Sequence, residues 1–579
     1  MTRRLPDRGS ADVAEPTERE PLLGSSDGDN DSISTASTAI NRNGTVKSTG
    51  EEEASLSSQT NGEAGKEFGR SHVARIISVL LIGIFVAHTD GSILLATHPI
   101  IASEFNQLTY SSWLITSFAL ASAATQTLYG KLSDIYGRKP LVLTAYVIFA
   151  VGCAIVGMGQ TMWQVVLGRI ISGAGASGMA ALVSVLITDL LPIRDVAQWR
   201  AYVNLVATFG RSVGGPLGGW LADMIGWRWS FLGQVPIITV AIVLCAAYLP
   251  GGTNDPEDLS DSAILVTKKS KFSRIDFKGS FIFALTVLAL LLPTEIGGVR
   301  LPWSHPIIVG LFALSLVLLF LFIEVEKRQE EPILPLEIFH KRDAVLSFLI
   351  AGLQTAAQLA LMFSVPLYFQ VTARASNTVA GAHLVPAVVG NAVGGILSGF
   401  FIKRSGRYKS LIIAAVTSSS IGYLLLMLRW HGNTNWLESL YIAPGGFGSG
   451  IAQSALFISL QVVVDPAHIA PAISFMYLST GVWYTMGLAV SNAIMQTNLR
   501  WGLARRLLEL GLSTEEIQKV ISSAISDLEF VGRSTGAIRE AIVEAYVDGF
   551  WWTHSFSFLC STTAFVLALL LKQRRLDSH

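Results

Sequence analysis

The stretch GKLSDIYGRK, residues 130–139, is the most informative part of this chain. It is a short charged segment between two apolar runs, a pattern typical of a tight turn where one membrane helix ends and the next begins. Asp134 and Arg138 are four residues apart, so their side chains can pair across one helical turn. Gly130 and Gly137 permit close helix packing and a sharp reversal of the chain.

A similar turn recurs downstream as GFFIKRSGRY, residues 399–408. Its glycines and arginine have the same spacing, and they are Gly399, Gly406 and Arg407. A membrane protein that repeats one turn in corresponding places is predicted to consist of two related halves. The second copy has Lys403 where Asp134 stands in the first, so only one half has the acid of this charge pair.

The composition indicates a membrane protein. The 579 residues are 51% hydrophobic and 15% charged, whereas soluble chains carry about a quarter charged residues. The net charge is zero, which argues against a nucleic-acid partner. Cys153, Cys245 and Cys560 lie inside apolar runs, so we expect no disulfide. The sequence contains no metal-ligand cluster, nucleophile elbow or phosphate loop, and the soluble segments are too short for an enzyme, so we expect no cofactor, no metal and no catalysis.

Apolar runs of about twenty residues predict transmembrane helices. We expect an all-α membrane protein with fourteen spans, both termini in the cytosol, and a 6+2+6 arrangement in which two spans lie between the halves. The expected spans are 76–98, 111–132, 141–160, 163–187, 199–221, 231–249, 278–296, 305–324, 344–369, 378–402, 410–428, 438–462, 470–495 and 549–571.

The domain boundaries follow from these spans. We expect a disordered cytosolic tail at 1–70, a six-helix bundle at 71–250, and two extra helices with their cytosolic loops at 251–343. A second six-helix bundle at 344–571 includes the non-cytosolic loop 499–548, and 572–579 is a cytosolic tail. The motif STEE at 513–516 and the apolar spacing after it predict one or two short amphipathic helices in that loop, lying against the membrane surface.

The orientation follows from the excess of lysine and arginine in the short loops on one side, which is the cytosolic side. These residues are Lys131, Arg138, Lys139, Arg194, Arg200, Lys268, Lys269, Lys271, Arg274, Lys278, Lys327, Arg328, Lys341, Arg342, Lys403, Arg404, Arg407, Lys409, Lys572, Arg574 and Arg575. The first seventy residues then lie in the cytosol. There Glu18, Leu22 and Leu23 form an acidic dileucine, a short signal for a sorting adaptor.

Four stretches resemble the signatures of the major facilitator superfamily, in its fourteen-span drug:proton antiporter-2 branch. They are the turn at 130–139, the first-span motif with Asp90, the fourth-span motif with Arg169, and the fifth-span stretch GGPLGG at 214–219. The dileucine, the long penultimate loop and GWRWSF at 226–231 make the chain similar to fungal vacuolar basic amino acid transporters. Multidrug exporters share most of these motifs.

The resemblance implies a proton-coupled antiporter that works by alternating access and moves basic amino acids from the cytosol into the vacuole. We expect a monomer in the lipid bilayer with a small cationic substrate and protons as partners. A plasma-membrane exporter of drugs or toxic metabolites is the alternative within transport. A nutrient sensor that does not transport is the alternative of another class.

Charged residues at membrane depth are costly, so each is a functional hypothesis. Asp90 is the expected proton-coupling carboxylate, which requires access to a central water-filled cavity. Arg169 is expected to hold or relay charge. Arg211 stands where a small residue is expected, and a cation there would repel a cationic substrate unless an acid neutralises it. Each of these side chains can instead serve packing alone.

Other residues are assigned by motif. Gly130, Asp134, Gly137, Arg138, Lys139, Gly406 and Arg407 are expected to form a conformational switch at the cytosolic ends of the helices. Gly214, Gly215, Pro216, Gly218 and Gly219 form the antiporter motif, in which the proline is expected to bend the fifth helix. The polar residues expected to face the cavity are Gln126, Asn204, Asn391 and Gln453.

Overall fold

The computed structural model describes residues 70–107, 112–249, 276–297, 301–329, 332–526, 528–574 and 576, all within the unit Phe68–His579. The dileucine with Glu18, Leu22 and Leu23 lies outside these residues. The described part of the chain is helical apart from turns and one isolated bridge between Gly297 and Leu301. The prediction of an all-α protein is therefore confirmed.

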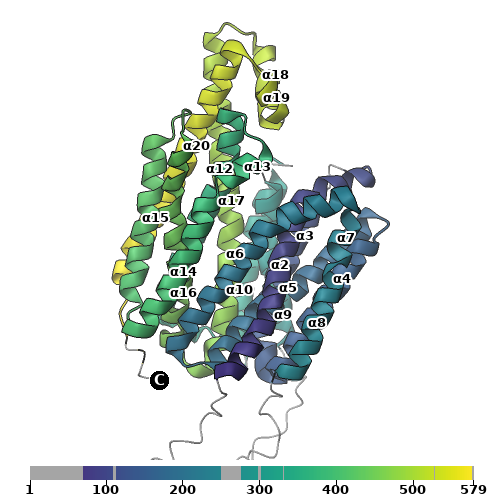
Figure 1. Cartoon of the computed structure of the whole chain (residues 1–579), viewed down its shortest axis with the longest axis vertical. Helices are drawn as coiled ribbons and strands as arrows, with labels where there is room; N and C mark the ends of the chain where they lie inside the picture. The colour runs from purple at the N-terminus through teal and green to yellow at the C-terminus, as the bar shows by residue number, and fades with distance from the viewer. Residues whose placement is uncertain are drawn as a thin grey trace, which may run out of the picture. The chain divides into compact units, whose positions relative to one another are not determined.

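The first half is a bundle built from six long helical segments. Its helices are α2 (Arg70–Glu104), α3 (Ser112–Tyr136), α4 (Arg138–Met158), α5 (Met162–Leu190), α6 (Ile193–Met224), α7 (Trp227–Leu232) and α8 (Gln234–Tyr248). Helix α2 packs along α6, and α5 packs against both α3 and α4 (Figure 1). Glycines of α5 that contact neighbouring backbone allow this close approach; for example, a Cβ at Gly173 would lie 2.4 Å from the Phe118 carbonyl oxygen.

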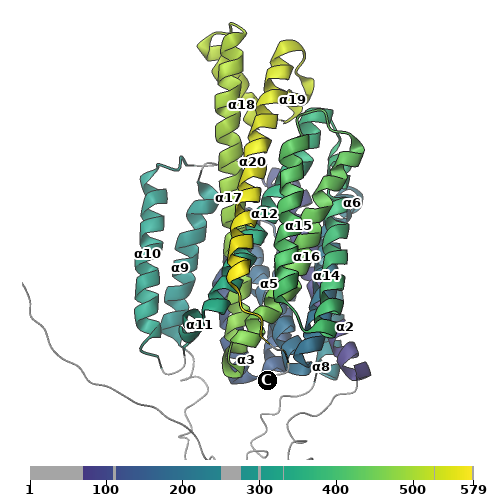
Figure 2. The same cartoon turned by 90° about the vertical axis from the view of Figure 1, so that its left-hand side faces the viewer.

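Two further helices stand beside the bundle. They are α9 (Phe277–Ile296) and α10 (Pro306–Glu326), which pack against each other (Figure 2). Helix α9 also contacts α3 and α17, whereas α10 exposes large apolar side chains such as Leu316 and Phe320. An apolar helix with so little protein contact fits a position facing lipid.

The second half is a bundle with the same number of long helical segments. It contains α11 (Glu337–His340), α12 (Arg342–Ala373), α13 (Asn377–Ala382), α14 (Val385–Ser405), α15 (Lys409–Arg429), η3 (Trp436–Ile442), α16 (Ala443–Val463), η4 (Pro466–His468), α17 (Ile469–Glu509), α18 (Thr514–Ser526), α19 (Leu528–Arg533) and α20 (Gly536–Leu570). Helix α14 packs against α16, and α12 packs against α20. The halves meet mainly where α6 contacts α14 and where α3 contacts α17.

Each expected span coincides with a helical segment; two of them contain a break in the helix, and a third changes from a 3-10 helix to an α-helix. Within the described residues, 11 helical stretches are long and apolar enough to cross a membrane, and α9 contains a shorter apolar helix, Lys278–Thr294. Helices α3 and α6 are outside the eleven, and α6 carries charged residues along its length. The number fourteen and the cytosolic position of the termini therefore stay predictions.

The predicted relation between the halves has a counterpart in the packing of the two repeated turns. Gly130, near the end of the second helix of the first half, lies against Ser474 of α17 in the second half. Gly399, in the equivalent helix of the second half, lies against Gln198 of α6 in the first. Since α6 and α17 are each the fifth long segment of their half, the two contacts are equivalent by exchange of the halves.

The segment 499–548 differs from the expectation. Helices α17 and α20 continue far past their expected spans, and α18 and α19 lie beside their far ends (Figure 2). Helix α18 begins at the expected capping box, in which Ser513 and Glu516 exchange hydrogen bonds. Its apolar residues Ile517 and Ile521 are buried in a cluster shared with α17 and α20, because a continuous helix pair offers them more apolar surface than a loop would. The predicted short amphipathic helices are therefore present and pack on α17 and α20, and their position on the membrane surface stays a prediction.

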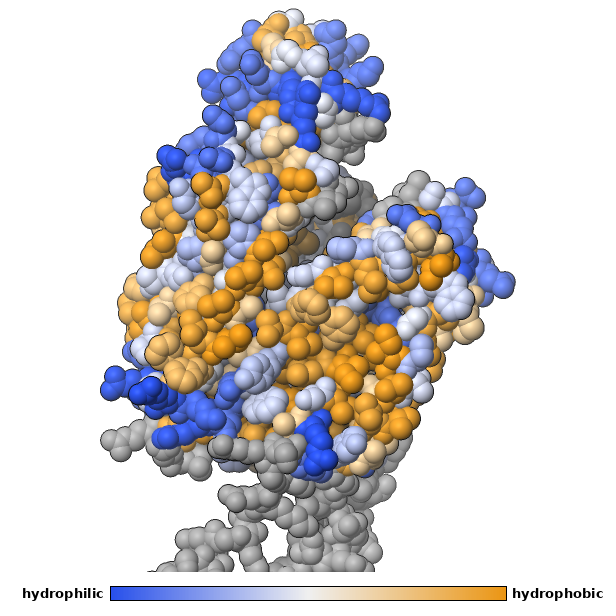
Figure 3. Space-filling view, in the orientation of Figure 1, coloured by the Kyte–Doolittle hydropathy of each residue, from blue (hydrophilic) through white to orange (hydrophobic). Residues whose placement is uncertain are grey.

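The surface shows an apolar band that crosses both halves between two hydrophilic ends (Figure 3). Large apolar side chains are exposed on several helices, among them Val240, Phe320 and Val566. Such a band is what the hydrocarbon core of a bilayer requires.

Candidate functional site

The two ends of the molecule are named after a residue that lies at each of them. The Arg138 end is where α3 ends and α4 begins, and it is predicted to be cytosolic. The Glu104 end is where α2 ends. Cross-contacts between the halves lie near the Arg138 end: Lys403 of α14 pairs with Asp195 of α6 at 2.7 Å, and Gln461 of α16 donates to Thr188 of α5. An ion pair and a hydrogen bond therefore hold the two halves together at the Arg138 end.

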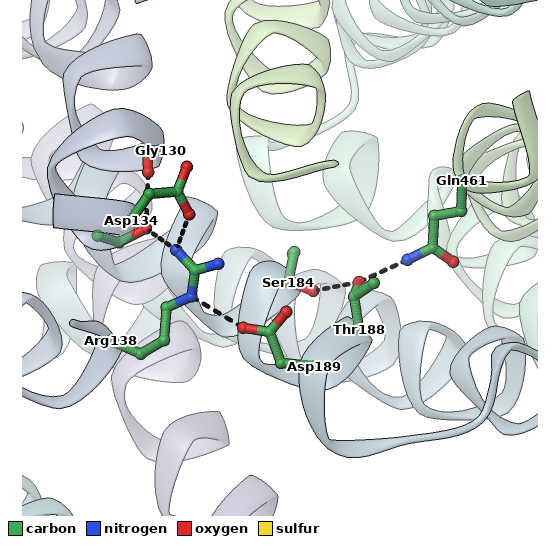
Figure 4. A network of polar contacts seen from close by, with 8 residues as sticks. Gly130, Asp134, Arg138, Ser184, Thr188, Asp189 and Gln461 are labelled. Carbon is green, nitrogen blue, oxygen red and sulfur yellow. Dashed lines mark hydrogen bonds and ion pairs between the residues drawn. The ribbon is translucent and has the colours of Figure 1, made fainter. Parts of the chain in front are cut away.

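The predicted switch turn lies beside these contacts (Figure 4). Arg138 pairs with Asp134 at 2.6 Å and with Asp189 of α5 at 2.8 Å, so one cation joins the ends of three helices. Gly137 has φ of 92°, a conformation that glycine adopts readily and other residues adopt rarely. Lys139 donates to the carbonyl oxygen of Leu249 at 2.8 Å, which ties α4 to the end of α8.

The equivalent turn of the second half is built differently. Gly406 has φ of 63° and ends α14. Arg407 is exposed, and the described residues give its side chain no ion pair. Instead, Lys403 makes the ion pair, and it does so across the interface to the first half. The lysine that departs from the first-half pattern is thus the residue that joins the two halves.

A cavity of ≈ 310 Å³ lies between the halves. It is lined by α2, α5 and α6 of the first half and by α12, α16 and α17 of the second. Figure 3 shows the surface hollowed between the halves on the side toward α18 and α19, which is the Glu104 end. The volume is at the lower end of the range for small-molecule sites. The cavity between the halves is therefore large enough for a small molecule.

The cavity wall mixes apolar and polar side chains from both halves. Its polar residues are His88, Arg200, Asn204, Arg211, Gln354, Thr355, Ser449, Gln453, Tyr477, Thr480 and Tyr484. None of the described lining residues is an aspartate or a glutamate.

The two arginines lie on α6, three turns apart, and both face the cavity. Arg211 is exposed there and donates to Thr208 Oγ1 at 3.3 Å. Arg200 is only 9% exposed; it donates to Ser184 Oγ and to the Tyr477 hydroxyl at 2.6 Å each, and its guanidinium lies 4.3 Å from the Phe457 ring centroid. The prediction that Arg200 is a cytosolic loop cation is wrong, because α6 begins at Ile193 and carries Arg200 into the bundle.

Asp90 and Arg169 form a buried ion pair outside the cavity. Their side chains are 0% and 1% exposed and lie 2.7 Å apart. Gln234 of α8 donates to Asp90 at 3.3 Å, and the Arg169 guanidinium lies 4.3 Å from the Phe118 ring centroid. The pair satisfies both charges within the first half. The expectation that Asp90 has access to the central cavity is therefore wrong for this conformation.

The four polar candidates have different positions. Asn204 and Gln453 line the cavity. Asn391 accepts a hydrogen bond from Asn204 at 2.7 Å across the interface. Gln126 is buried, donates to the carbonyl oxygen of Ser177 at 3.3 Å, and is not among the described lining residues.

The antiporter motif brings α6 against α2. A Cβ at Gly214 would lie 2.5 Å from the Thr89 carbonyl oxygen, and one at Gly218 would lie 2.9 Å from the Ile93 Cα. Gly215 is less crowded, and Gly219 has nothing within 4 Å. Helix α6 continues through Pro216 to Met224 without ending. This packing holds Arg211 in place, since Ser92 of α2 donates to the Arg211 carbonyl oxygen at 2.7 Å.

The sequence profile of the Major Facilitator Superfamily matches residues 80–488. The chain belongs to this family. It is thus an integral, multi-pass membrane protein of a transporter family, and nothing in this assignment suggests an enzyme.

The relatives of this chain include vacuolar amino acid transporters and a multidrug resistance protein. The vacuolar membrane amino acid uptake transporter fnx2 of Schizosaccharomyces pombe is 29% identical over 87% of this chain and 85% of the relative. The multidrug resistance protein fnx1 of the same yeast is 28% identical over 86% of this chain and 92% of the relative. The vacuolar basic amino acid transporter 2 of Saccharomyces cerevisiae is 27% identical over 80% of this chain and 98% of the relative.

The fold also matches solved structures of the family. The proton:xylose symporter XylE superimposes with a TM-score of 0.56 at 13% identity, over 88% of this chain and 98% of that one. The human organic anion transporter MFSD10 gives a TM-score of 0.53 at 13% identity, over 86% and 99%. At this identity the likeness concerns the fold alone.

Several residues that hold the Arg138 end together or line the cavity were not predicted from the sequence. Asp189, Asp195 and Gln461 hold the Arg138 end together, and Gln354 and Tyr477 line the cavity. Asp189 and Asp195 were detectable as acids at the ends of two apolar runs. Gln354 and Tyr477 carry no signal in the sequence, because an isolated polar residue in an apolar helix does not show which side of the helix faces the cavity.

Proposed function

We propose that the chain is an alternating-access transporter of the vacuolar membrane, which moves amino acids from the cytosol into the vacuole in exchange for protons. The observation that carries the proposal is the cavity between the halves, with polar residues from both. The names of fnx2 and of the vacuolar basic amino acid transporter 2 support the substrate class and the membrane.

The direction of access follows from the contacts between the halves. Lys403–Asp195 and Gln461–Thr188 hold the Arg138 end together, while the surface is hollowed between the halves at the opposite end (Figure 3). In the opposite state these contacts are broken, the halves rotate, and the cavity opens toward the Arg138 end. The Arg138 turn is the conformational switch of this proposal: its ion pairs to Asp134 and Asp189 stabilise the state described here and break when the Arg138 end opens.

Proton coupling is assigned to the Asp90–Arg169 pair. Protonation of Asp90 would remove the partner charge of Arg169, which is then buried and unpaired. An unpaired buried cation is costly, so this state favours a conformation in which Arg169 finds another partner or water. Because Asp90 does not line the cavity in this conformation, the coupling acts through helix movement and not through direct competition with substrate at one carboxylate.

An exporter of drugs or toxic metabolites at the plasma membrane is the second candidate. The likeness to the multidrug resistance protein fnx1, over 86% of this chain, favours it. The two candidates differ in membrane and in substrate, so one set of measurements separates them.

The test is uptake by isolated vacuoles from cells with and without this chain. We expect ATP-dependent uptake of at least one radiolabelled amino acid, abolished by a protonophore and reduced at least several-fold in the deletion. Equal uptake in both kinds of vacuole would remove the proposal. Replacing Leu22 and Leu23 with alanine is the companion experiment, because loss of vacuolar location would support the sorting signal, whereas a tagged wild type at the cell surface would favour the exporter.

A further inference from the structure

The charges around the cavity conflict with a cationic substrate. Arg200 and Arg211 both face it, and the lining residues that the structure describes include no carboxylate. Neither arginine has an ion-pair partner among the described residues. The sequence alone left open whether an acid neutralises Arg211, and the lining residues within the described ranges provide none.

Arg211 is placed to bind an anion. Its side chain is exposed and is one of the residues that line the cavity. A guanidinium has five N–H donors, and the hydrogen bond to Thr208 uses one of them. Its backbone is fixed by the hydrogen bond from Ser92 and by the close packing of Gly214 on α2. The group is therefore held in position with donor capacity left for a ligand.

Arg200 adds a second cation deeper in the interface. Ser184 and Tyr477 take hydrogen bonds from one of its terminal nitrogens, while its buried Nε has no hydrogen-bond partner. A buried cation held only by neutral groups costs free energy, which an anionic ligand would recover. Planar paired donors also match the geometry of a carboxylate.

The second half offers a neutral acceptor on the opposite wall. Gln354 of α12 lines the cavity and donates to Ser561 Oγ at 3.0 Å, which leaves its buried Oε1 without a partner. This oxygen is shielded from the cavity in this conformation, so an ammonium group can donate to it once the Gln354 side chain turns into the cavity. A zwitterion with its carboxylate toward α6 and its ammonium toward α12 would therefore contact both halves.

We propose that this cavity recognises its substrate by a carboxylate, bound by Arg211 and Arg200, and that it favours neutral or acidic amino acids over basic ones. The proposal rests on the proposed function, because it names the group by which a transported amino acid is held. The extra ammonium of lysine would lie near two arginines with no acid among the described lining residues. This proposal departs from the expectation of a cationic substrate, and the experiment below decides between the two.

The test is binding of radiolabelled alanine to the purified full chain. Unlabelled alanine, glutamate, lysine, alaninamide and lysinamide are the competitors. Alanine and glutamate should bind more tightly than lysine, and each amide, which lacks the α-carboxylate, should bind about 10-fold to 100-fold more weakly than its parent, the range for a lost charge-assisted hydrogen bond. Arg211→Gln should abolish the preference for alanine over alaninamide, and Arg211→Lys should keep part of it. Arg404→Gln, an exposed arginine at the end of α14, is the matched control and should change nothing.

Three outcomes would overturn the proposal: lysine binding as tightly as alanine, lysinamide binding as tightly as lysine, or an unchanged preference in Arg211→Gln. Absence of binding by every one of these probes would overturn it as well. Uptake by reconstituted vesicles under a pH gradient is measured in parallel. Carboxylate-dependent binding without any uptake would reject the proposed transport function and leave the recognition proposal standing.

Discussion

The Asp90–Arg169 pair is the costliest arrangement at the scale of single residues, because two full charges are removed from water inside the first half. Such a pair is stable only when both partners are present and hydrogen-bonded. Gln234, the Leu114 carbonyl oxygen and the Phe118 ring complete its surroundings. Arg200 is held differently, by two hydroxyl groups and two aromatic rings, and Arg211 donates to one hydroxyl group, which agrees with a role toward a ligand.

Breaking this pair on one side leaves the other group buried without its partner. We predict that Asp90→Asn and Arg169→Gln each destabilise the protein by about 3–5 kcal/mol, while the double variant loses less than the sum of the two. Thermal unfolding in detergent measures the stability, and pH-driven uptake measures the coupling. Additive losses would show that the two charges do not depend on each other. pH-driven flux that persists in Asp90→Asn would remove Asp90 from the coupling mechanism.

Glu104 provides a pH-dependent contact outside the candidate span His72–His98. Its pKa lies below the ordinary value of 4.5 because Trp227 donates to it at 2.6 Å, with Arg228 pairing at 2.8 Å. A lowered pKa means that the contact stabilises fully above pH 4.5 and is lost as the pH falls through the lowered pKa.

We therefore predict that Glu104→Gln lowers stability by at most about 1 kcal/mol at neutral pH, since the pair is partly exposed. Thermal unfolding of wild type and variant between about pH 7 and pH 3 should show a constant difference down to pH 4.5 and a shrinking one below it. A difference that grows on acidification would contradict the assignment.

At the scale of elements, glycine spacing sets how closely α2 and α6 approach. Gly210, Gly214 and Gly218 recur every four residues and face Phe85, Thr89 and Ile93, which have the same spacing on α2. This is the small-residue seam by which membrane helices pack without a hydrophobic driving force. The seam also determines where Arg211 lies relative to the cavity.

Gly214→Ala should destabilise this seam. The added methyl would lie 2.5 Å from the Thr89 carbonyl oxygen, so the helices must separate, at a cost of about 1–3 kcal/mol. Gly219→Ala is the matched control, because it meets nothing within 4 Å, and alanine there should be neutral or stabilising by up to about 1 kcal/mol. Thermal unfolding compares the two. Equal effects of the two substitutions would mean that the seam does not limit the packing.

At the scale of the whole molecule, the balance between the two access states depends on cross-contacts at one end. One of these cross-contacts is the ion pair between Lys403 and Asp195, whose side chains are 41% and 19% exposed. A partly exposed pair contributes about 0–1 kcal/mol, which still changes the population ratio by up to about 5-fold.

We predict that Lys403→Gln reduces access to the cavity from the Glu104 end by up to about 5-fold. A cysteine introduced at Thr355 reports this through its rate of labelling by an impermeant maleimide in vesicles with the Glu104 end outward. The native Cys153, Cys245 and Cys560 are buried, so the background is low. Exchange of the charges, Lys403→Asp with Asp195→Lys, should restore labelling. If the maleimide labelling rate is unchanged in Lys403→Gln, this ion pair does not hold the two halves together.

The sequence by itself determined the helical membrane class, the repeated turn and the family motifs, because these depend on local hydropathy and on residues close together in the chain. It also located Asp134–Arg138, a contact within one helical turn. Only the tertiary structure decided that Asp90 forms a buried ion pair with Arg169 and that Arg200 lies inside the bundle. It also decided that Lys403 of the second half pairs with Asp195 of the first. These outcomes depend on how each helix is rotated and where it crosses its neighbours, which side-chain packing between distant segments sets and local sequence does not.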